Sequence, residues 1–337
     1  MNSSIEKNLR FKVVITDSSY PSNEPERRVL AGLAELNILQ PPQRKTEEGL
    51  IEALRDADGI LNESITITRR IIESLEKCRI IVRYGVGYDN VDVDAATERG
   101  ILVCNVPDYC IDEVADHTMA LILALNRKLL QLDGAVKAGA WDWKLFQPIR
   151  PLKDAVLGIL GFGRIGAAVA ERARSFGLKI VASDPYVSEE KLRSQKVEPL
   201  SLAALLEASD IVSLHVPLTK ETYHMLGEGE LRRMKKTAYI VNTSRGALID
   251  SRALYKALSE GWIAGAALDV WEVEPPRKEE PLLRLPNVIA TPHIAWYSEE
   301  SLKRLQVRAA EEVARVLRGE KPRSPVNLRA IEERKGK

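Results

Sequence analysis

The stretch AVLGILGFGRIG, residues 155–166, decides the fold of this chain. Its apolar first half predicts a buried strand, and the residues after it predict a helix that closes at Gly177. Between the two lie Gly161, Gly163 and Gly166, in the spacing G-x-G-x-x-G. Such glycines allow a tight turn, a close approach of backbone to pyrophosphate, and close packing of helix on strand. The stretch therefore predicts a dinucleotide site, and a glycine-rich turn without a ligand is the alternative.

The residues around this turn indicate which dinucleotide binds. The helix begins at Arg164 and Ile165, where unpaired backbone N–H groups can bind phosphates. Asp184 stands eighteen residues after Gly166, at the end of the next predicted strand. A carboxylate there accepts hydrogen bonds from the ribose hydroxyls of adenosine, and it repels a 2′-phosphate. We therefore expect NAD rather than NADP, since Arg193 lies too far along the chain to bind a phosphate.

Alternating strands and helices extend from this stretch in both directions. Short β-branched strands separated by helices of about ten residues indicate parallel sheets built from βαβ units. The later strands are predicted at AVLGIL (155–160), KIVASD (179–184), DIVSLHV (210–216), AYIVN (238–242), GAALD (265–269) and NVIAT (287–291). The earlier ones are predicted at KVVIT (12–16), GILN (59–62), RIIVRY (79–84) and ILVCNV (101–106), with a helix over ERRVLAGLAEL (26–36). The fold class is thus α/β, with two doubly wound parallel-sheet domains, one flavodoxin-like and one Rossmann.

Two helical segments predict how the domains are divided. The segment 112–132 is apolar at too many positions for one exposed stripe, so we expect it to be buried against another subunit or domain. The C-terminal helix comes after the last strand and is expected to pack on the first domain, which is then discontinuous. We expect a substrate-binding domain formed by residues 1–106 and 295–337, and an NAD-binding domain formed by residues 107–294.

The composition argues against several classes of protein. Lys and Arg number 49 and Asp and Glu 48, so no strong field favours nucleic acid or an anionic membrane. No apolar run is long enough for a membrane span, and the N-terminus lacks the apolar core of a signal peptide. The three cysteines have neither metal-ligand spacing nor a disulfide pattern, and EVADH (113–117) offers too few ligands for a metal. We expect a soluble cytoplasmic protein without a metal, a nucleic-acid partner or a membrane partner.

Polar residues follow three strands of the second series. Arg245 comes just after AYIVN, and His293 comes just after NVIAT. Asp269 ends the strand GAALD, and Glu274 follows five residues later. Hydride transfer to or from a carbonyl needs a cation that holds an anionic substrate and a group that moves a proton at the oxygen. Arg245 offers a fork for a carboxylate, and His293 can move the proton if Glu274 stabilises the imidazolium form.

Over nearly its whole length the chain resembles the D-2-hydroxyacid dehydrogenase family. The resemblance is carried by RYGVGYDNVD (83–92), NVPDYCIDEVADHT (105–118), NTSRGALID (242–250) and TPHIAWYSEE (291–300), and within the family it is nearest to the C-terminal binding protein branch. The glycine turn in the middle of the chain separates it from the L-lactate and malate dehydrogenases, whose turn lies near the N-terminus. The resemblance implies an NAD-dependent homodimeric oxidoreductase that acts on a small D-2-hydroxy acid or 2-keto acid.

The resemblance also implies roles for particular residues. The catalytic residues would be Arg245, Glu274 and His293, with Glu274 paired to His293. The residues on the nicotinamide and ribose side of the cofactor would be Pro217, Thr222, Thr243 and Asp269.

For the substrate, the resemblance implies that Arg83 and the turn 85–87, which contains Val86 and Gly87, face its carboxylate across the interdomain cleft. A structural ion pair is the alternative for Arg83. Trp296 would select the substrate side chain, with plain packing as its alternative.

Other functions remain open from the sequence. An NAD(H)-sensing scaffold that binds partner proteins would agree with the branch resemblance, although the three catalytic residues argue for chemistry. Oxidation of formate or phosphite on the same fold ranks lower, because family formate enzymes carry glutamine at the position of Glu274. Oxidation of phosphoglycerate is a further possibility. The sequence does not name the substrate.

Overall fold

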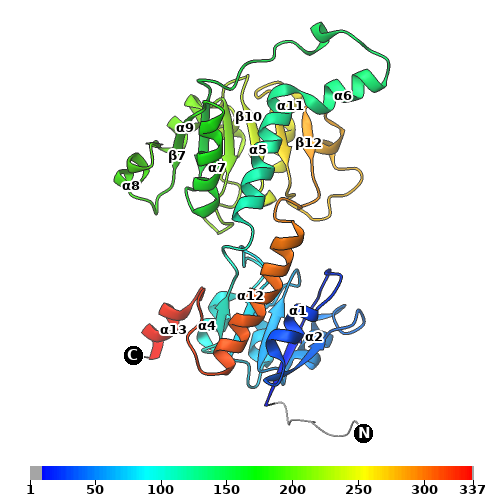
Figure 1. The fold of residues 1–337 in the computed structure, drawn as a ribbon, viewed down its shortest axis with the longest axis vertical. Coiled ribbons are helices and arrows are strands. Elements are labelled where there is room, and N and C mark those ends of the chain that lie inside the picture. Colours follow the sequence, from blue (N-terminus) through cyan, green and yellow to red (C-terminus); the bar gives the residue numbers. More distant parts are fainter. Residues whose placement is uncertain (1–9, 336–337) are drawn as a thin grey trace. The chain divides into compact units, whose positions relative to one another are not determined.

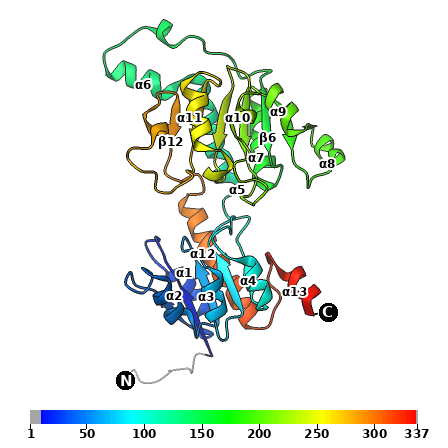
Figure 2. The same ribbon diagram turned by 180° about the vertical axis from the view of Figure 1, so that it is seen from behind.

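The computed structural model describes residues 10–335 and divides them into two compact units. Unit 1 takes the residues up to Tyr109 together with those from Ser298 onward, and unit 2 takes Cys110–Tyr297. These limits lie three residues later than the limits expected from the sequence, at 109 rather than 106 and at 298 rather than 295. Figures 1 and 2 show each unit as a sheet with helices on its faces.

Unit 1 contains a five-stranded sheet in the order β2-β1-β3-β4-β5, the flavodoxin-like order. The strands are β1 (Phe11–Ile15), β2 (Ala34–Ile38), β3 (Gly59–Asn62), β4 (Ile80–Arg83) and β5 (Leu102–Cys104). All neighbours are parallel, so the carboxyl ends of the strands meet at one edge. This confirms the predicted doubly wound sheet.

The strand β2 corrects the helix expected over residues 26–36. The helix α1 (Glu24–Leu30) ends just before Gly32, whose φ of +71° suits glycine. Ala34–Ile38 then pairs with β1 along its whole length. As an edge strand, β2 leaves Glu35 exposed and so lacks a continuous apolar run. Its residues Ala, Glu and Leu are helix formers, and the sequence alone therefore predicts a helix. Pairing with β1 outweighs that weak helix propensity.

The C-terminal helix α12 (Glu299–Leu317) packs on α1 and on the strands β3 and β4, as Figure 1 shows. The position of a Cβ on Gly59 would lie 2.9 Å from the Val313 side chain, so β3 and α12 approach closely. The expectation that this helix packs on the first domain is met. The remaining helices of unit 1 are α2 (Glu47–Leu54), α3 (Arg69–Ser74), α4 (Val93–Glu98) and α13 (Leu328–Lys335).

Unit 2 contains a seven-stranded parallel sheet in the order β12-β11-β10-β9-β6-β7-β8. The strands are β6 (Val156–Leu160), β7 (Lys179–Ser183), β8 (Glu198–Pro199), β9 (Ile211–Leu214), β10 (Tyr239–Asn242), β11 (Gly265–Leu268) and β12 (Val288–Ala290). Only the two-residue β8 was not expected. The chain order reverses between β6 and β9, and such a switch point is where dinucleotides bind.

Two helical layers cover this sheet. Ile159 faces the layer of α5 and α7, whereas Leu160 faces the layer of α9 and α11. Figure 1 shows α5 and α7 in front of the sheet, and Figure 2 shows α10 and α11 from the other side. The elements are α5 (Ile111–Arg127), α6 (Leu129–Lys137), α7 (Arg164–Ser175), α8 (Glu189–Ser194), α9 (Leu202–Ala208), α10 (Glu228–Leu231), α11 (Ser251–Ser259), η1 (Trp143–Phe146), η2 (Gly246–Leu248) and η3 (Pro281–Arg284).

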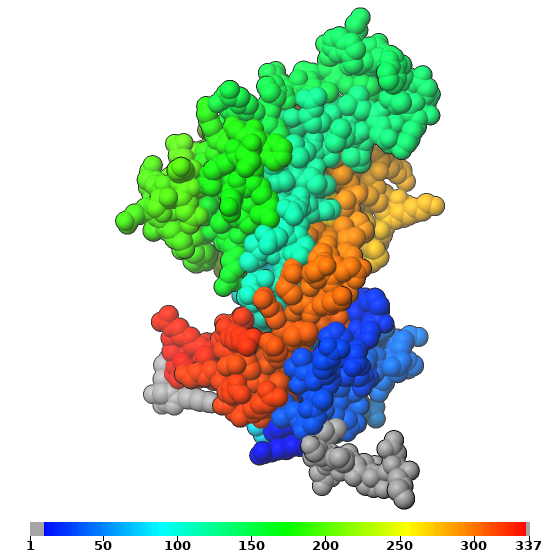
Figure 3. Space-filling model, in the orientation of Figure 1, coloured from blue at the N-terminus to red at the C-terminus, as the bar shows by residue number. Residues whose placement is uncertain are grey.

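The long helix expected over 112–132 is broken at Lys128, which has a left-handed φ of 52°. Before the break, α5 packs on α7, β10 and β11 of its own unit, so its apolar face needs no second subunit. After the break, α6 has no buried residue. Figure 3 shows the blue-green segment after α5 on the surface of unit 2. No helix within residues 10–335 has the length and apolar character that a bilayer crossing needs.

Candidate active site

The glycine turn lies between β6 and α7, as the sequence predicts. Gly161 has a φ of +86°, and a Cβ there would lie 2.6 Å from the carbonyl oxygen of His215. A Cβ on Gly166 would lie 2.3 Å from the carbonyl oxygen of Gly161. These two glycines are therefore required by the fold itself. They bring β6, β9 and the start of α7 into close contact at the switch point of the sheet.

Gly163 needs a different explanation. Its φ of −78° suits any residue, and no protein atom lies within 4 Å of the position that a Cβ would take. Nothing in the described protein therefore requires glycine here, which leaves open space over the turn. Close approach of a pyrophosphate uses such space. Arg164 is exposed and Ile165 half-buried at the first positions of α7, so these residues fit a dinucleotide.

Asp184 follows β7 and is held by two backbone donors. Its Oδ2 accepts a hydrogen bond from the N–H of Phe162 at 2.8 Å, inside the glycine turn. Its Oδ1 accepts one from the N–H of Tyr186, also at 2.8 Å. The carboxylate is thus fixed beside the turn, and each oxygen keeps a lone pair for a ribose hydroxyl.

The loop after β9 contains His215, Pro217 and Thr222. The hydroxyl of Thr222 donates to the carbonyl of Pro217 at 2.7 Å and so shapes this loop. His215 lies against Gly161, with its Nε2 2.8 Å from the Ser213 hydroxyl. Burial lowers the pKa of His215 to about 4, so it is neutral at pH 7. This histidine therefore packs against the glycine turn. In the sequence, only its position after a buried strand indicated that it lies near the site.

Arg245 and Thr243 follow β10. The Thr243 hydroxyl lies 3.0 Å from that of Thr118 on α5. The backbone carbonyl of Arg245 accepts from the Asn242 amide at 2.8 Å. A Cβ on the next residue, Gly246, would lie 1.9 Å from a backbone carbon of Trp271. Glycine at 246 therefore lets the loop that carries Arg245 pack on the loop that follows β11.

Glu274 and His293 form the pair that the resemblance implies. His293 Nδ1 lies 2.6 Å from Glu274 Oε2, and Glu274 Oε1 accepts from the N–H of Trp271 at 2.9 Å. Burial raises the pKa of Glu274, but the hydrogen bond and charge of His293 and the charge of Arg245 outweigh it, so this pKa lies below its ordinary value. The His293 side chain is 37% exposed, and the Glu274 side chain is 35% exposed. Because Nδ1 is engaged, Nε2 of His293 can exchange a proton with a ligand.

The backbone of His293 is left-handed, with a φ of 52°. A non-glycine residue in this region costs on the order of 1–2 kcal/mol. The fully buried Asp269 holds it there: its Oδ1 accepts from the hydroxyl of Thr291 at 2.6 Å and the N–H of Ile294 at 3.0 Å, and its Oδ2 from the N–H of Ala295 at 2.9 Å. The Asp269 carbonyl accepts from the N–H of His293 at 2.7 Å. Asp269 therefore fixes the turn that presents the imidazole.

His117 joins the same group of residues. Its Nε2 lies 3.2 Å from the Thr291 hydroxyl and 3.7 Å from Asp269 Oδ1. In the sequence it stood out only within EVADH, as a poor metal motif. Its position on α5, far from residue 291 along the chain, gave no signal of this contact. No group of three potential ligands for a metal occurs within residues 10–335.

The substrate residues expected near Arg83 belong to unit 1. Arg83 ends β4, and a Cβ on Gly85 would lie 1.6 Å from Arg83 Nη1, so the guanidinium rests directly on this glycine. Gly85 has a φ of +140°, and the carbonyl of Val86 accepts from the Asn105 amide at 2.6 Å. The turn that continues into Gly87 is therefore fixed at the carboxyl edge of the sheet.

Trp296 belongs to unit 2, three residues after His293. It is half-buried, and its ring meets that of Tyr297 edge to face, with 5.5 Å between the centroids. Ile294 and Tyr297 are each 41% exposed. The segment after His293 thus presents apolar surface beside the histidine.

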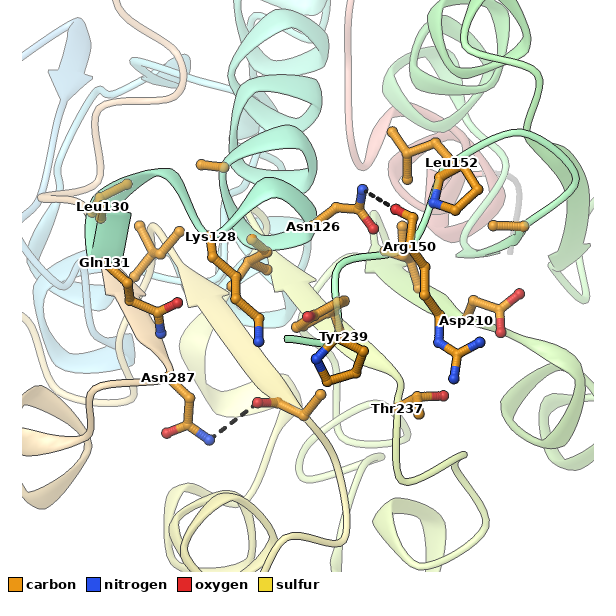
Figure 4. Close-up of a pocket in the computed structure, with 18 of the residues that line it drawn as sticks. Asn126, Lys128, Leu130, Gln131, Arg150, Leu152, Asp210, Thr237, Tyr239 and Asn287 are labelled. Atoms are coloured by element: carbon orange, nitrogen blue, oxygen red, sulfur yellow. Dashed lines mark hydrogen bonds between the residues drawn. The ribbon is translucent and has the colours of Figure 1, made fainter. Parts of the chain in front are cut away.

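A cavity of about 620 Å³ lies elsewhere in unit 2 (Figure 4). Its lining includes Ala155, Asp210, Tyr239 and Ala264, which stand at the amino ends of β6, β9, β10 and β11. The polar groups described above follow the carboxyl ends of the strands. This cavity is therefore separate from the candidate active site.

Comparison with known proteins agrees with this geometry. Residues 119–295 match the family described as "D-isomer specific 2-hydroxyacid dehydrogenase, NAD binding domain". The chain is similar to a glyoxylate reductase of Korarchaeum cryptofilum, with 46% identity over 299 residues that cover 87% of this chain and 89% of that protein.

A second relative differs in length. The D-3-phosphoglycerate dehydrogenase of Methanocaldococcus jannaschii is 44% identical over 326 residues, which cover 96% of this chain but only 61% of that protein. Among solved structures, a D-lactate dehydrogenase from Aquifex aeolicus, complexed with NAD and lactic acid, has a TM-score of 0.82 at 31% identity and covers 95% of this chain and 98% of that one.

Proposed function

The chain belongs to the D-isomer specific 2-hydroxyacid dehydrogenase family, and on this premise we propose that it transfers a hydride between NAD(H) and a small 2-keto or 2-hydroxy acid. The observation that carries the proposal is the His293–Glu274 pair, 2.6 Å apart, in the same unit as the glycine turn. A paired, accessible histidine at the same carboxyl edge of the sheet as a dinucleotide turn suits a reaction that moves a hydride and a proton together.

The proton is assigned to His293. When bound, NADH supplies the hydride. In reduction the Nε2 of His293 donates a proton to the carbonyl oxygen of the substrate, and in oxidation it accepts the hydroxyl proton. Glu274 stabilises the imidazolium through Nδ1 and fixes the ring. Arg245, whose charge acts on Glu274, is assigned to the substrate carboxylate.

The other residues are assigned to binding. Gly161, Gly163, Arg164, Ile165 and Gly166 would bind the pyrophosphate, and Asp184 the adenosine ribose. Pro217, Thr222, Thr243 and Asp269 would shape the nicotinamide side. Arg83, Val86 and Gly87 of unit 1 would bind the substrate carboxylate, and Trp296 would contact its side chain.

The test is a steady-state assay of a panel of 2-keto acids with NADH, which includes glyoxylate, pyruvate and hydroxypyruvate. We expect turnover of at least one, with product of the D configuration where the product is chiral. Lack of turnover across the panel, in a protein that binds NADH, would contradict the proposal.

We further propose that the protein is a cytoplasmic homodimer. Cys78, Cys104 and Cys110 form no disulfide bond, which suits a reducing compartment. Six large apolar residues are exposed within a short segment after α5; they are Leu129, Leu130, Val136, Trp141, Trp143 and Leu145. Exposed apolar side chains in one segment suit contact with a second copy.

A further inference from the structure

We infer that Glu63 restricts the substrate to 2-keto acids that carry one negative charge and excludes those with a second anionic group. This inference rests on the proposed function and names the substrate class for it. It concerns the carboxyl edge of the sheet in unit 1, where Arg83 also lies.

The position of Glu63 points to ligand contact. It follows β3, which lies between β1 and β4 in the sheet. The chain order of a flavodoxin-like sheet reverses between β1 and β3, and ligands bind outside the carboxyl ends of the strands at that point. Asn62 pairs with Arg83 across β3 and β4, so Glu63 and Arg83 emerge at the same edge.

The carboxylate of Glu63 is held in place by two hydrogen bonds from Ser19. Its Oε2 accepts from the N–H of Ser19 at 2.8 Å, and its Oε1 accepts from the Ser19 hydroxyl at 2.5 Å. Burial raises the pKa of Glu63 above its ordinary value, although these two hydrogen bonds and the charge of Arg83 oppose the increase. Both donors are on Ser19, which suits an acceptor-only carboxylate.

Asp17 fixes the backbone of the same turn. Its Oδ1 accepts from the N–H of Glu63 at 3.1 Å, and its Oδ2 accepts from the N–H of Ser64 at 2.8 Å. Asp17 is only 6% exposed. Asp17 is therefore a positioning residue. Its carboxylate bonds to backbone N–H groups of the protein, and it thereby fixes the segment that carries Glu63 at the carboxyl edge of the sheet.

Arg83 and Glu63 place one cationic and one carboxylic side chain at the same edge of the sheet. Arg83 can bind the carboxylate that every 2-keto acid carries. A phosphate or second carboxylate would face Glu63 instead, and repulsion between like charges at a partly buried site disfavours its binding.

Similar proteins are named glyoxylate reductase and D-3-phosphoglycerate dehydrogenase. The inference distinguishes between these two activities, since glyoxylate carries one negative charge and phosphoglycerate carries more than one. It assigns this chain to singly charged substrates.

The test compares hydroxypyruvate with 3-phosphohydroxypyruvate, which differ only in the phosphate, with NADH in the complete protein. We expect the kcat/KM of the wild-type protein to be at least tenfold higher for hydroxypyruvate. Glu63→Gln should narrow this ratio about tenfold, the scale of one charge interaction at a partly exposed site. Glu63→Asp keeps the carboxylate, so its ratio of kcat/KM for the two acids should stay closer to that of the wild-type protein than the ratio of Glu63→Gln does.

Glu35→Gln is the matched control, because Glu35 is exposed on β2 and forms no ion pair within the part of the chain described. Its ratio should equal that of the wild-type protein. Equal use of both acids by the wild-type protein, or a preference for the phosphate ester, would overturn the inference even if a variant failed to fold. An unchanged ratio in Glu63→Gln would overturn the role of Glu63. If neither acid were reduced although NADH bound, the proposed function would fail, and the inference with it.

Discussion

At the scale of single residues, we expect the carboxylate of Asp184 to determine the preference between NADH and NADPH. It is held by the N–H groups of Phe162 and Tyr186, so it cannot swing away from a 2′-phosphate. We predict that Asp184→Ala reduces the preference for NADH over NADPH about tenfold, the scale of one lost charge repulsion. The measurement is kcat/KM with each cofactor, with Glu190→Ala on the surface of α8 as control. Equal use of both cofactors by the wild-type protein would refute this role.

The pair of Glu274 and His293 should control the pH dependence. Reduction needs His293 protonated, and the carboxylate of Glu274 stabilises that form. Because the pKa of Glu274 is lowered, it is ionised throughout the neutral range. We predict that Glu274→Gln moves the upper pH limb of kcat/KM for reduction to lower pH, since the proton is then lost more easily.

His293→Ala is the companion variant. It should lower kcat about a hundredfold or more while the Kd for NADH stays nearly unchanged, because only the proton transfer is lost. Titration of NADH by fluorescence separates the two effects. A pH profile of Glu274→Gln identical to that of the wild-type protein would mean that the pair is structural.

Trp296 should act on the substrate side chain. Burial of an apolar side chain against such a ring stabilises binding by up to about 1.5–3 kcal/mol, which is ample for tenfold discrimination. We predict that Trp296→Ala lowers kcat/KM for long apolar 2-keto acids more than for glyoxylate. An equal decrease in kcat/KM for both substrates would assign Trp296 to packing alone. Tyr297→Ala, at the exposed neighbour that contacts Trp296, is the control variant.

Some of these residues could be found in the sequence and others could not. The glycine turn, Asp184 and the Glu274–His293 pair stand in local motifs, so their spacing and resemblance sufficed. His117 and Glu63 carry no local signal. Their meaning depends on contacts with residues far along the chain, Thr291 for His117 and Ser19 for Glu63. Only the folded sheets bring these residues together.

At the scale of elements, the break at Lys128 changes where we expect the dimer contact, from the helix α5 to the segment that follows it. The apolar face of α5 is used inside unit 2, and the exposed apolar residues begin at Leu129. We predict that the double variant Trp141→Ser, Trp143→Ser weakens the dimer, because these indoles are 87% and 70% exposed. Light scattering over a dilution series measures the effect, with Tyr186→Ser as an exposed control. A wild-type protein that is monomeric at micromolar concentration would contradict the dimer.

Element types were predicted better than element ends. Strands buried on both faces, such as β6 and β9, have continuous apolar runs that sequence alone identifies. The helix predicted over residues 26–36 was wrong at β2, because β2 is an edge strand with Glu35 exposed and its Ala, Glu and Leu residues favour helices. The end of α5 was also missed, because Lys128 is left-handed without a glycine or proline to mark it.

At the scale of the whole molecule, unit 1 depends on both ends of the chain. Leu302, Leu305, Val313 and Leu317 of α12 are buried in it. At about 1.5–3 kcal/mol for each such side chain, their loss approaches the full stability of a typical domain. We predict that deletion of residues 298–337 unfolds unit 1 while unit 2 keeps its sheet and binds NADH. Circular dichroism and NADH fluorescence test this, and a truncated chain that kept the full helix and strand content would contradict it.

The packing of α12 on the first sheet also fixes an order of events during synthesis. A ribosome makes β1 to β5 first, yet α12, the helix that covers β3 and β4, is made only after the whole of unit 2. Unit 2, made in between from one continuous segment, can close before unit 1 does. For that interval the nascent chain carries an uncovered apolar sheet face. A chaperone that binds such faces would therefore find its target on the sheet of unit 1 until α12 has been made.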